Sequence, residues 1–462
     1  MTTSASFSCD VSWHRHDNGT TLVAGSPLTI FALSNAGREV AQALETGSPL
    51  PDVHRPLTTR LEAAGAIHPR VDPLDEPLDS LLTVVIPAFV DTATRNDQLT
   101  KLVDDLASRC AVIVVDDASP LPLNVSHAKT VIRLSSNDGP GVARNAGLSE
   151  VTTPFVAFID SDVTQCAAAL PLLVALCSLD GVALAAPRVA SQPGTNRIAR
   201  YEERFSPLDL GSHPGRIAPG SRVSYVPSAA WVVRTDVAKS LGGFDPTLRV
   251  GEDVDFVWRL VRAGHCARYE PRVTVLHDPR PRLTAFLAQR YFYGTSVGPL
   301  SARHPGLLRP LKASWHSVAV WAFLFAGLPI VSVALALFTF IGLARRLRHL
   351  DHGVLEASRL VIRGHWSALT SAVRALRREW ILITLVFAVG SGYLNGLALA
   401  VLAIPPIAEY LRGPKRLDPC TFAVLRTLDD ASYGIGACVA CVRQRTIKPL
   451  LPDLRTWRAS VN

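Results

Sequence analysis

Short apolar runs alternate with amphipathic segments through the middle of the chain. Five runs of strand length occur in order, at residues 82–89, 111–119, 130–136, 155–162 and 182–189. Between them lie segments with helical spacing of apolar residues, such as 96–108. This alternation is typical of a parallel sheet covered by helices, so we predict an α/β domain over residues 82–300.

The regions on either side of this domain have different patterns. Residues 1–75 contain short apolar stretches and helical patterns at 35–45 and 57–67, and they end in a Pro- and Asp-rich segment that is typical of a linker. We therefore predict a small α+β domain over 1–75. From residue 301 to residue 462 the chain becomes strongly apolar, which predicts a hydrophobic helical region.

Two stretches in this last region, 317–344 and 380–408, carry no charged residue. Each is longer than the roughly 20 residues that cross a bilayer. The segment between them, 345–379, has eight arginines against three acids, which favours a cytoplasmic location. We predict membrane association and leave the topology open, because Pro329 allows a re-entrant hairpin and buried core helices are the alternative.

The composition and net charge of the chain are consistent with several kinds of binding partner. The chain has 462 residues, 19% of them charged, a net charge of +8, a mean hydropathy of +0.22 and a pI near 9.2. This charge suits anionic lipid, a phosphorylated substrate or nucleic acid.

The cysteines and the N-terminus suggest a reducing compartment. The eight cysteines are scattered, and Cys110, Cys166 and Cys177 lie in apolar segments, so we predict reduced thiols. Cys438 and Cys441 have no second pair or histidine cluster, which makes a metal or redox role unfavourable. Residues 1–22 lack an apolar core of signal-peptide length, so we do not predict export.

Two of the predicted strands end in pairs of acids. Asp160 and Asp162 end one strand, and Asp116 and Asp117 end another. Either pair alone is as consistent with a helix cap or a turn. Together they indicate one crevice for a polar ligand at the carboxyl edge of the sheet. If this ligand is a nucleotide, the carboxylates require a divalent cation, Mn²⁺ or Mg²⁺, to hold its diphosphate.

Two later segments add candidate residues. Gly139 and Gly141 allow close approach of the backbone at a helix start, and Arg144 follows on that helix. In the segment 250–265, Glu252 and Asp253 open another helix, where they either complement the helix dipole or accept a proton from an attacking hydroxyl.

His277 ends a further predicted strand. A lone histidine is more often structural, but an imidazole also suits a metal site that already contains Asp162.

The motifs resemble a known family when they are taken as a set. The segments TVVIPAF, VVDDAS, GPGVARNAG, FIDSD, GGFD and GEDVDFVWRL occur in the order seen in the inverting nucleotide-sugar glycosyltransferases of family two. The resemblance covers residues 82–300 and implies their Rossmann-like GT-A fold. Segments along nearly the whole chain, SPLTIFALSNAGREV, YVPSAAWVVR, YEPRVTVLHD, YGTSVGPLSARHP and TLDDASYGIG, are similar to the glycosyltransferases of the mycofactocin system.

This resemblance implies roles for the candidate residues. Pro87 and Asp117 match positions that line the nucleoside, with Asp117 next to uracil, and Arg144 matches a contact to the base. Asp116, Gly139 and Glu252 are further candidates for substrate binding.

The same resemblance implies the metal ligands and the base. Asp160 matches a position near the ribose or the metal, Asp162 matches a metal ligand, and His277 matches a third ligand that some relatives use. Asp253 matches the catalytic base, which deprotonates the acceptor hydroxyl before a single inverting displacement.

Two positions depart from the family pattern. Relatives that polymerise and extrude sugar have a Gln-x-x-Arg-Trp signature, whereas this chain has Gln289, Arg290 and Tyr291 without that spacing, which argues against processive extrusion. Arg290 is equally consistent with a diphosphate clamp and with a helix-surface arginine. Val90 replaces the usual polar residue after the first strand.

The resemblance also implies substrates and location. The donor is expected to be UDP-glucose, and the acceptor a peptide-derived redox cofactor, mycofactocin or its precursor, that receives several β-linked glucose units. Residues 26–70 resemble winged-helix-like modules that dock peptides, or they only pack on the catalytic domain. We expect a membrane-bound enzyme with its catalytic domain in the cytoplasm, where nucleotide sugars occur, and no nucleic-acid partner. A lipid-phosphate acceptor and a non-catalytic nucleotide-sugar-binding scaffold are the alternatives.

Overall fold

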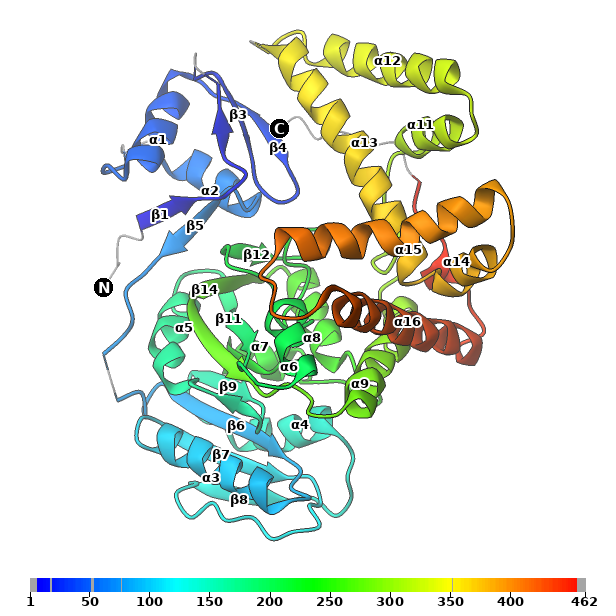
Figure 1. Ribbon diagram of the computed structural model, residues 1–462. Coiled ribbons are helices and arrows are strands. Elements are labelled where there is room, and N and C mark those ends of the chain that lie inside the picture. Colours follow the sequence, from blue (N-terminus) through cyan, green and yellow to red (C-terminus); the bar gives the residue numbers. More distant parts are fainter. Residues whose placement is uncertain (1–5, 17–18, 51–53, 76, 351, 455–462) are drawn as a thin grey trace. The chain divides into compact units, whose positions relative to one another are not determined.

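The computed structural model describes residues 6–16, 19–50, 54–75, 77–350 and 352–454, and they form two compact units (Figure 1). The sheet unit comprises Met1–Ser12, Gly25–Pro27 and Gln42–Pro281, and the helical unit comprises Trp13–Ala24, Leu28–Ala41 and Arg282–Asn462. Parts of the first 75 residues belong to each unit, so an independent domain over 1–75 stays a prediction. Residues 1–5 and 17–18 of the segment 1–22, which lacks the pattern of a signal peptide, lie outside the described residues.

A mixed sheet forms the centre of the sheet unit, and within the described residues it has nine strands. In chain order these strands are β6 (Leu82–Ala88), β7 (Ala111–Asp116), β8 (Thr130–Arg133), β9 (Phe155–Ile159), β10 (Val163–Thr164), β11 (Val182–Ser191), β12 (Gly215–Ile217), β13 (Ala230–Arg234) and β14 (Cys266–His277). All five strands predicted from the sequence are present. Their spatial order runs β10-β14-β11-β13-β9-β6-β7-β8, with β12 paired to β14.

The five strands predicted from the sequence all run in the same direction, but the sheet as a whole is mixed, because it contains further strands that run the other way. Strands β9, β6, β7 and β8 are parallel, but β13 runs antiparallel to both β9 and β11. Strands β10 and β12 are also antiparallel to β14. A buried strand shows the same apolar run in either direction, so its sequence does not reveal its orientation.

Helices cover both faces of this sheet. They are α3 (Ala93–Ala107), α4 (Pro140–Glu150), η2 (Ala167–Ala169), α5 (Leu170–Cys177), α6 (Arg197–Phe205), α7 (Thr235–Ser240) and α8 (Glu252–Arg262). Helix α3 starts where the Thr92 side chain accepts a hydrogen bond from the Arg95 amide, as expected of an N-cap threonine.

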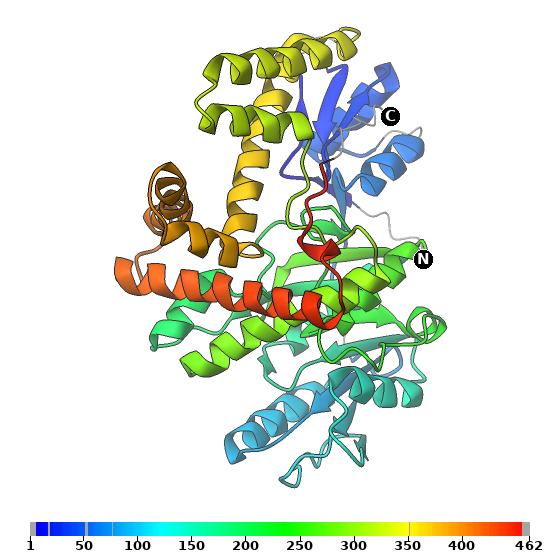
Figure 2. The same cartoon turned by 90° about the vertical axis from the view of Figure 1, so that its right-hand side faces the viewer.

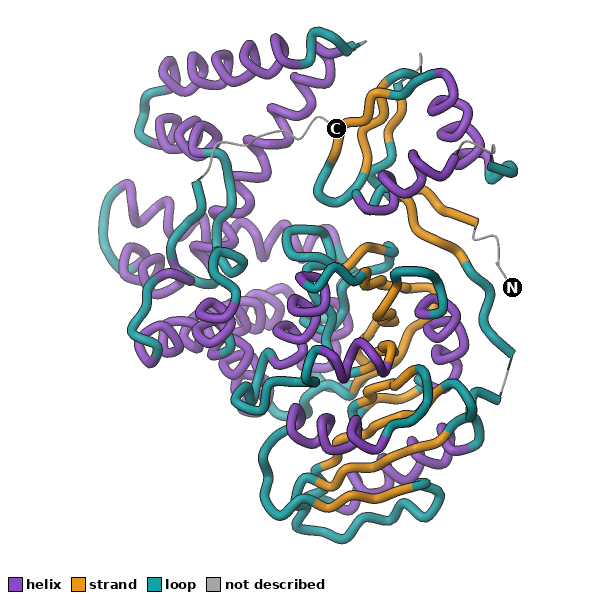
Figure 3. The backbone as a smooth tube through the Cα atoms, turned by 180° about the vertical axis from the view of Figure 1, so that it is seen from behind, coloured by secondary structure: helices purple, strands orange, loops and turns teal. Residues whose placement is uncertain are grey.

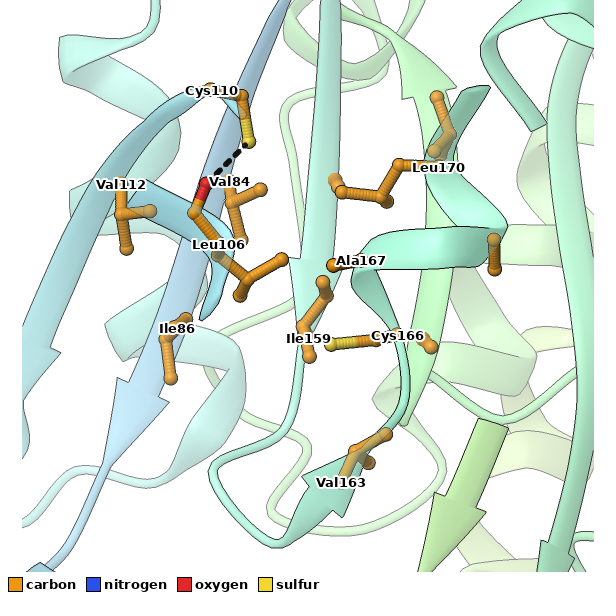
Figure 4. Close-up of a cluster of buried hydrophobic side chains, with 14 of the residues drawn as sticks. Val84, Ile86, Leu106, Cys110, Val112, Ile159, Val163, Cys166, Ala167 and Leu170 are labelled. Carbon is orange, nitrogen blue, oxygen red and sulfur yellow. Dashed lines mark hydrogen bonds between the residues drawn. The ribbon is translucent and has the colours of Figure 1, made fainter. Parts of the chain in front are cut away.

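One face of the sheet packs against α3 and α5. Alternate residues of β6, Val84 and Ile86, meet apolar side chains of α3 such as Leu106, and Cys166 and Leu170 belong to the same buried cluster (Figure 4). The predicted burial of Cys110, Cys166 and Cys177 is confirmed, and none of the eight cysteines, which lie in the described ranges, forms a disulfide.

The opposite face of β6 lies against α4. A Cβ atom added to Gly147 would be only 2.3 Å from Cγ1 of Val85 and 3.2 Å from Cγ2 of Val115. Because residue 147 has no side chain, α4 can approach the sheet closely. Helix α4 begins directly after the glycine-rich turn at Gly139.

The N-terminal segment joins the sheet unit through a buried ion network. Strand β1 (Ser6–Cys9) pairs antiparallel with β5 (Ile67–Arg70), after α2 (Arg55–Ala63). Asp10 Oδ2 lies 2.9 Å from His68 Nε2 and 2.6 Å from Arg222 Nη2. Burial opposes ionisation, but hydrogen bonds from His68 and Arg222 outweigh it and hold the pKa of Asp10 well below its ordinary value.

The helical unit contains a small antiparallel sheet and a series of helices (Figure 3). Its elements are β2 (His14–Arg15), β3 (Thr21–Ala24), β4 (Thr29–Ala32), α9 (Leu283–Thr295), α10 (Val297–Arg303), α11 (Trp315–Phe325), α12 (Pro329–Arg346), α13 (Gly353–Arg377), α14 (Ile381–Ala388), α15 (Tyr393–Arg412), α16 (Pro419–Arg443) and η3 (Lys448–Leu450). Helix α1 (Asn35–Thr46) follows β4, as predicted. The winged-helix comparison stays a prediction.

Each charge-free stretch is broken into two helices. The first separates into α11 and α12 at residues 326–328, and the second into α14 and α15 at residues 389–392. Among the described residues, α12 and α15 are long and apolar enough to cross a membrane, and only 6% and 11% of their most apolar windows are buried. The alternative of buried core helices is therefore wrong.

We expect Gly147→Ala to destabilise the protein, because its methyl group would collide with buried Val85. Overpacking of this kind costs about 1–3 kcal/mol, measured as a lower midpoint of chemical denaturation. Gly364→Ala in α13 is the matched control, since no heavy atom lies within 4 Å of the added Cβ and a helical alanine is favourable. Equal destabilisation by the two substitutions would contradict the packing explanation.

Candidate active site

A buried arginine connects three separate segments of the sheet unit. Arg144 on α4 is 2% exposed, and its Nη2 donates to Asp160 Oδ1 at 2.6 Å while Nη1 donates to Glu252 Oε1 at 2.8 Å. Asp160 follows β9 and Glu252 opens α8. The guanidinium also lies 5.3 Å from the centre of the Phe244 ring. One side chain therefore holds the start of α8 close to the end of β9.

This arrangement perturbs Glu252. Burial is the main cause, and the adjacent charge of Asp253 adds to it, so that the pKa of Glu252 rises to about 7 although Arg144 opposes the shift. The Arg144 guanidinium has two carboxyl partners, and the pKa of one of them, Glu252, is raised by its surroundings.

Asp253 lies beside this ion pair at the first turn of α8. Its Oδ1 accepts a hydrogen bond from the Val254 amide at 2.7 Å, and its Oδ2 accepts one from the Ser228 amide at 3.3 Å. The side chain is partly exposed. Burial raises the pKa of Asp253 above its ordinary 3.8, while the hydrogen bonds and the Arg144 charge offset part of the effect. A carboxylate with a raised pKa is a stronger base.

An aromatic cluster fixes the position of α8. The Phe244 ring centre lies 4.9 Å from that of Phe256 on α8 and 5.0 Å from that of Phe158 on β9. Trp231 on β13 lies 5.6 Å from Phe256. All four side chains are buried, so the start of α8 is attached to the sheet by packing as well as by charge.

A second ion pair on α8 holds the loop that precedes this helix. This pair was not predicted from the sequence. Asp255 accepts from Arg259 Nε at 2.7 Å, and the same arginine donates to the carbonyl oxygens of Leu241 and Gly243, each at 2.7 Å. The i, i+4 spacing of acid and base on a predicted helix is the sequence signal that identifies such a pair.

Asp162 and His277 come together across a strand pair. Strand β10 pairs with β14 so that Val163 lies opposite His277, and Asp162 Oδ2 is 3.3 Å from His277 Nε2. Arg280, which the sequence analysis did not consider, lies 3.6 Å from the same oxygen. Burial alone would raise the pKa of Asp162, but His277 and Arg280 outweigh it and bring the pKa to about 2.

The two acids that end β7 are engaged with protein groups. Asp116 accepts from the Ser119 amide at 2.8 Å and forms an ion pair with Arg133. Asp117 accepts from the amides of Asp138 and Gly139 at 2.9 and 3.0 Å. Gly139 has φ +96°, a conformation that favours glycine. Asp117 thus shapes the glycine-rich turn that precedes α4.

Pro87 and Val90, two further positions singled out in the sequence, are both buried. Pro87 is buried in β6 opposite Val115. Val90 is 1% exposed, and its amide donates to the Ser119 hydroxyl at 2.9 Å.

Arg290 belongs to α9 in the helical unit, where it is 1% exposed and its Nε lies 3.0 Å from Asp429 Oδ1. The helix-surface alternative for Arg290 is therefore wrong.

Two groups of side chains have the chemistry of a metal site. Asp160, Asp162 and His277 offer carboxylate and imidazole donors, which suit Mn²⁺ or Mg²⁺, and Asp162 and His277 already converge.

In the described part of the helical unit, one ligand atom each from His14, His16 and Glu356 lies within 4.8 Å of the other two. Arg359 Nη1, however, lies 2.9 Å from both His14 Nε2 and Glu356 Oε1. Arg359 therefore adds positive charge to this second group, as Arg144 and Arg280 do to the first.

Comparison with known proteins decides the family. A model described as glycosyl transferase family 2 matches residues 83–242. The pre-mycofactocin glycosyltransferases of two strains of Mycobacterium tuberculosis are each 36% identical to this chain over 460 residues, which is 95% of this chain and 95% of each relative. The chain belongs to the pre-mycofactocin glycosyltransferase family. It is a glycosyltransferase, and its sheet unit carries the family-two domain with a GT-A-like α/β fold.

More distant relatives share less of the chain. An uncharacterised glycosyltransferase of Haemophilus influenzae is 23% identical over 198 residues, which is 41% of this chain and 65% of that protein. A solved structure of a mannosyltransferase from Pyrobaculum calidifontis, in complex with GDP-mannose and Mn²⁺, is 17% identical, with a TM-score of 0.43 over 80% of this chain and 89% of its own. The family assignment does not depend on this likeness.

We expect Arg144→Met to destabilise this glycosyltransferase by about 3–5 kcal/mol, because it leaves the buried carboxyl group of Glu252 and the partly buried one of Asp160 without their cation. Arg95→Met is the matched control, since the Arg95–Asp91 pair is largely exposed and such pairs contribute under about 1 kcal/mol. Chemical denaturation of both variants checks the difference. A loss for Arg144→Met no larger than for Arg95→Met would show that Arg144 does not hold the site together.

Proposed function

We propose that Asp253 is the general base of a single inverting displacement. The observation that carries this proposal is the position of Asp253 at the start of α8, which Arg144 ties to the end of β9. Asp253 takes the proton of the acceptor hydroxyl, and the hydroxyl oxygen forms a bond to the anomeric carbon of the donor sugar. The bond from that carbon to the nucleoside diphosphate breaks, and the configuration inverts.

Asp160, Asp162 and His277 are proposed to hold a divalent cation, Mn²⁺ or Mg²⁺, for which their oxygen and nitrogen donors fit. Such a cation supplies charge neutralisation to the departing diphosphate. Arg280 adds positive charge at the same place, since it lies 3.6 Å from Asp162. Arg144 keeps Asp160 oriented through its 2.6 Å hydrogen bond.

The nucleoside is proposed to bind at the carboxyl ends of β6 and β7. Pro87 and Asp117 line it, and Asp117 also fixes the turn at Gly139, whose lack of a side chain gives the donor room. Asp116 supports this region through its bond to the Ser119 amide. Arg144 and Glu252, which are paired with each other, are proposed to bind the donor, with Arg144 next to the nucleobase. The donor is proposed to be UDP-glucose.

The acceptor is proposed to be the peptide-derived redox cofactor mycofactocin or its precursor. Two relatives with 95% mutual coverage are named pre-mycofactocin glycosyltransferases, which supports this choice. We propose that several β-linked glucose units are added in successive rounds. The N-terminal segment over residues 26–70 is a candidate for docking the peptide part of the acceptor.

A lipid phosphate is the second candidate acceptor. The exposed apolar surfaces of α12 and α15 favour it. A non-catalytic scaffold is less well supported, because it would not need the raised pKa of Asp253. We also propose that the enzyme is bound to the cell membrane with its sheet unit in the cytoplasm, where the nucleotide sugar is available.

The test is transfer from UDP-glucose, with Mn²⁺ or Mg²⁺, to the peptide-derived acceptor by detergent-solubilised protein, with products identified by mass. Wild-type protein should add hexose units. Asp253→Asn should lower the rate by at least about 100-fold, as expected for loss of a general base, while UDP-glucose binding is retained. Transfer only to a lipid phosphate would replace the acceptor, and binding without any transfer would support the scaffold.

The rate of transfer should fall on the acid side of its pH profile. Asp253 works only when deprotonated, and burial raises its pKa above 3.8. The decline should therefore begin at a higher pH than an exposed aspartate would give. The profile of kcat/KM against pH reports this pKa for the free enzyme. The residual activity of Asp253→Asn should lack this acid limb, and an unchanged limb would assign the titration to another group.

A further inference from the structure

The two broken apolar stretches of the helical unit form helical hairpins with uncovered turns (Figure 2). Hairpin one consists of α11 and α12, and hairpin two consists of α14 and α15. All residues from 322 to 331, around the first turn, are exposed, and every one of them is apolar or glycine. At the two turns Ile330 is 85% exposed and Val389 is 86% exposed.

Each hairpin has one arm that is too short to cross a bilayer. Helix α11 has 11 residues and α14 has 8, which at 1.5 Å per residue gives lengths of about 16 and 12 Å. The hydrocarbon core of a bilayer is about 30 Å thick. The short arms therefore match one leaflet, and neither stretch is long enough to cross and return.

Both ends of hairpin one are attached to folded protein. Leu347 and Leu350, directly after α12, pack in a buried cluster with Val23 of β3 and Ile30 of β4. At the other arm, Trp321 Nε1 on α11 donates to the carbonyl oxygen of His365 on α13 at 2.7 Å. If α12 spanned the membrane, Leu347 and Leu350 would be separated from the sheet that covers them.

Hairpin two is attached in the same way. Arg377, at the end of α13, lies 2.9 Å from Asp430 on α16. Glu409, near the end of α15, accepts from Arg426 on α16 at 2.8 Å. The chain that enters hairpin two and the chain that leaves it therefore contact one and the same helix.

The charges lie at the open ends of the hairpins and not at their turns. Exposed arginines 345 and 346 end α12 and exposed Arg348 follows it, and exposed basic residues 412, 415 and 416 lie at and after the end of α15. Basic groups at the open ends of the hairpins complement the phosphates of anionic lipids. The turns of both hairpins point to the same side of the helical unit in Figures 1 and 3.

We propose that both hairpins enter one leaflet of an anionic bilayer from the same face and return to it, so that the chain is monotopic and does not span the membrane. This inference rests on the proposed membrane association and specifies how it occurs. The arginine-rich segment 345–379 contacts the N-terminal sheet of β2, β3 and β4. The monotopic arrangement keeps both on the same side of the membrane.

The first test is co-flotation of the full-length protein with vesicles of phosphatidylglycerol and phosphatidylcholine. Ile330→Glu and Val389→Glu place a charge in each turn and should each weaken binding at least about tenfold, because charges are costly in hydrocarbon. Val131→Glu is the control: Val131 is an apolar residue of β8 that is 48% exposed, and its substitution should leave binding unchanged. Vesicles of phosphatidylcholine alone should bind the wild-type protein more weakly.

The second test locates the segments between the hairpins. Trypsin added to inside-out vesicles should cut after residues 345–348 and 415–416, as it does in detergent, and trypsin added to right-side-out spheroplasts should cut neither segment. If residues 345–348 were protected in inside-out vesicles but cut in spheroplasts, α12 would span the membrane. This outcome would overturn the proposal.

The outcomes separate the two levels of the proposal. A wild-type protein that fails to float would overturn membrane association itself, and the hairpin model with it. Flotation that both charged turn variants retain would overturn insertion of the hairpins while leaving association intact. Neither result bears on sugar transfer, which is measured on detergent-solubilised protein.

Discussion

The site depends on the burial of one guanidinium between two carboxyl groups. Arg144 is almost completely removed from solvent, and it pairs with Asp160 and Glu252 from segments distant in the sequence. A buried charge without partners is strongly unfavourable, so the three groups are stable only together. Because Asp253 follows Glu252, this requirement also fixes the candidate base beside the end of β9.

Packing supports what the charges specify. Gly147 lets α4, which carries Arg144, press against Val85 and Val115. On the α8 side, Phe244 and Phe256 join Phe158 in an aromatic cluster. The ion pairs therefore lie between elements that the apolar core already holds at close range, which limits the conformational cost of forming them.

The helical unit follows a different rule. Its apolar helices leave hydrophobic residues uncovered at the turns, while polar contacts such as Trp321 to His365 and Arg426 to Glu409 attach these helices to α13 and α16. A soluble fold would bury such surfaces. This distribution, together with the basic residues at the open ends, is the basis for the proposed insertion of the hairpins into lipid.

The sequence by itself determined the local elements and the chemical types at the site. The strands through residues 82–191, the acids after β7 and β9, and the Glu252–Asp253 helix start are all local patterns of apolar periodicity and capping. Only the tertiary structure decided the antiparallel direction of β13, the partners of Arg144, the burial of Arg290 against Asp429, and the division of each apolar stretch into a hairpin. These properties depend on contacts between residues far apart in the chain. A run of apolar residues predicts that the segment will be buried or will contact lipid. It does not predict which neighbouring segment will cover it.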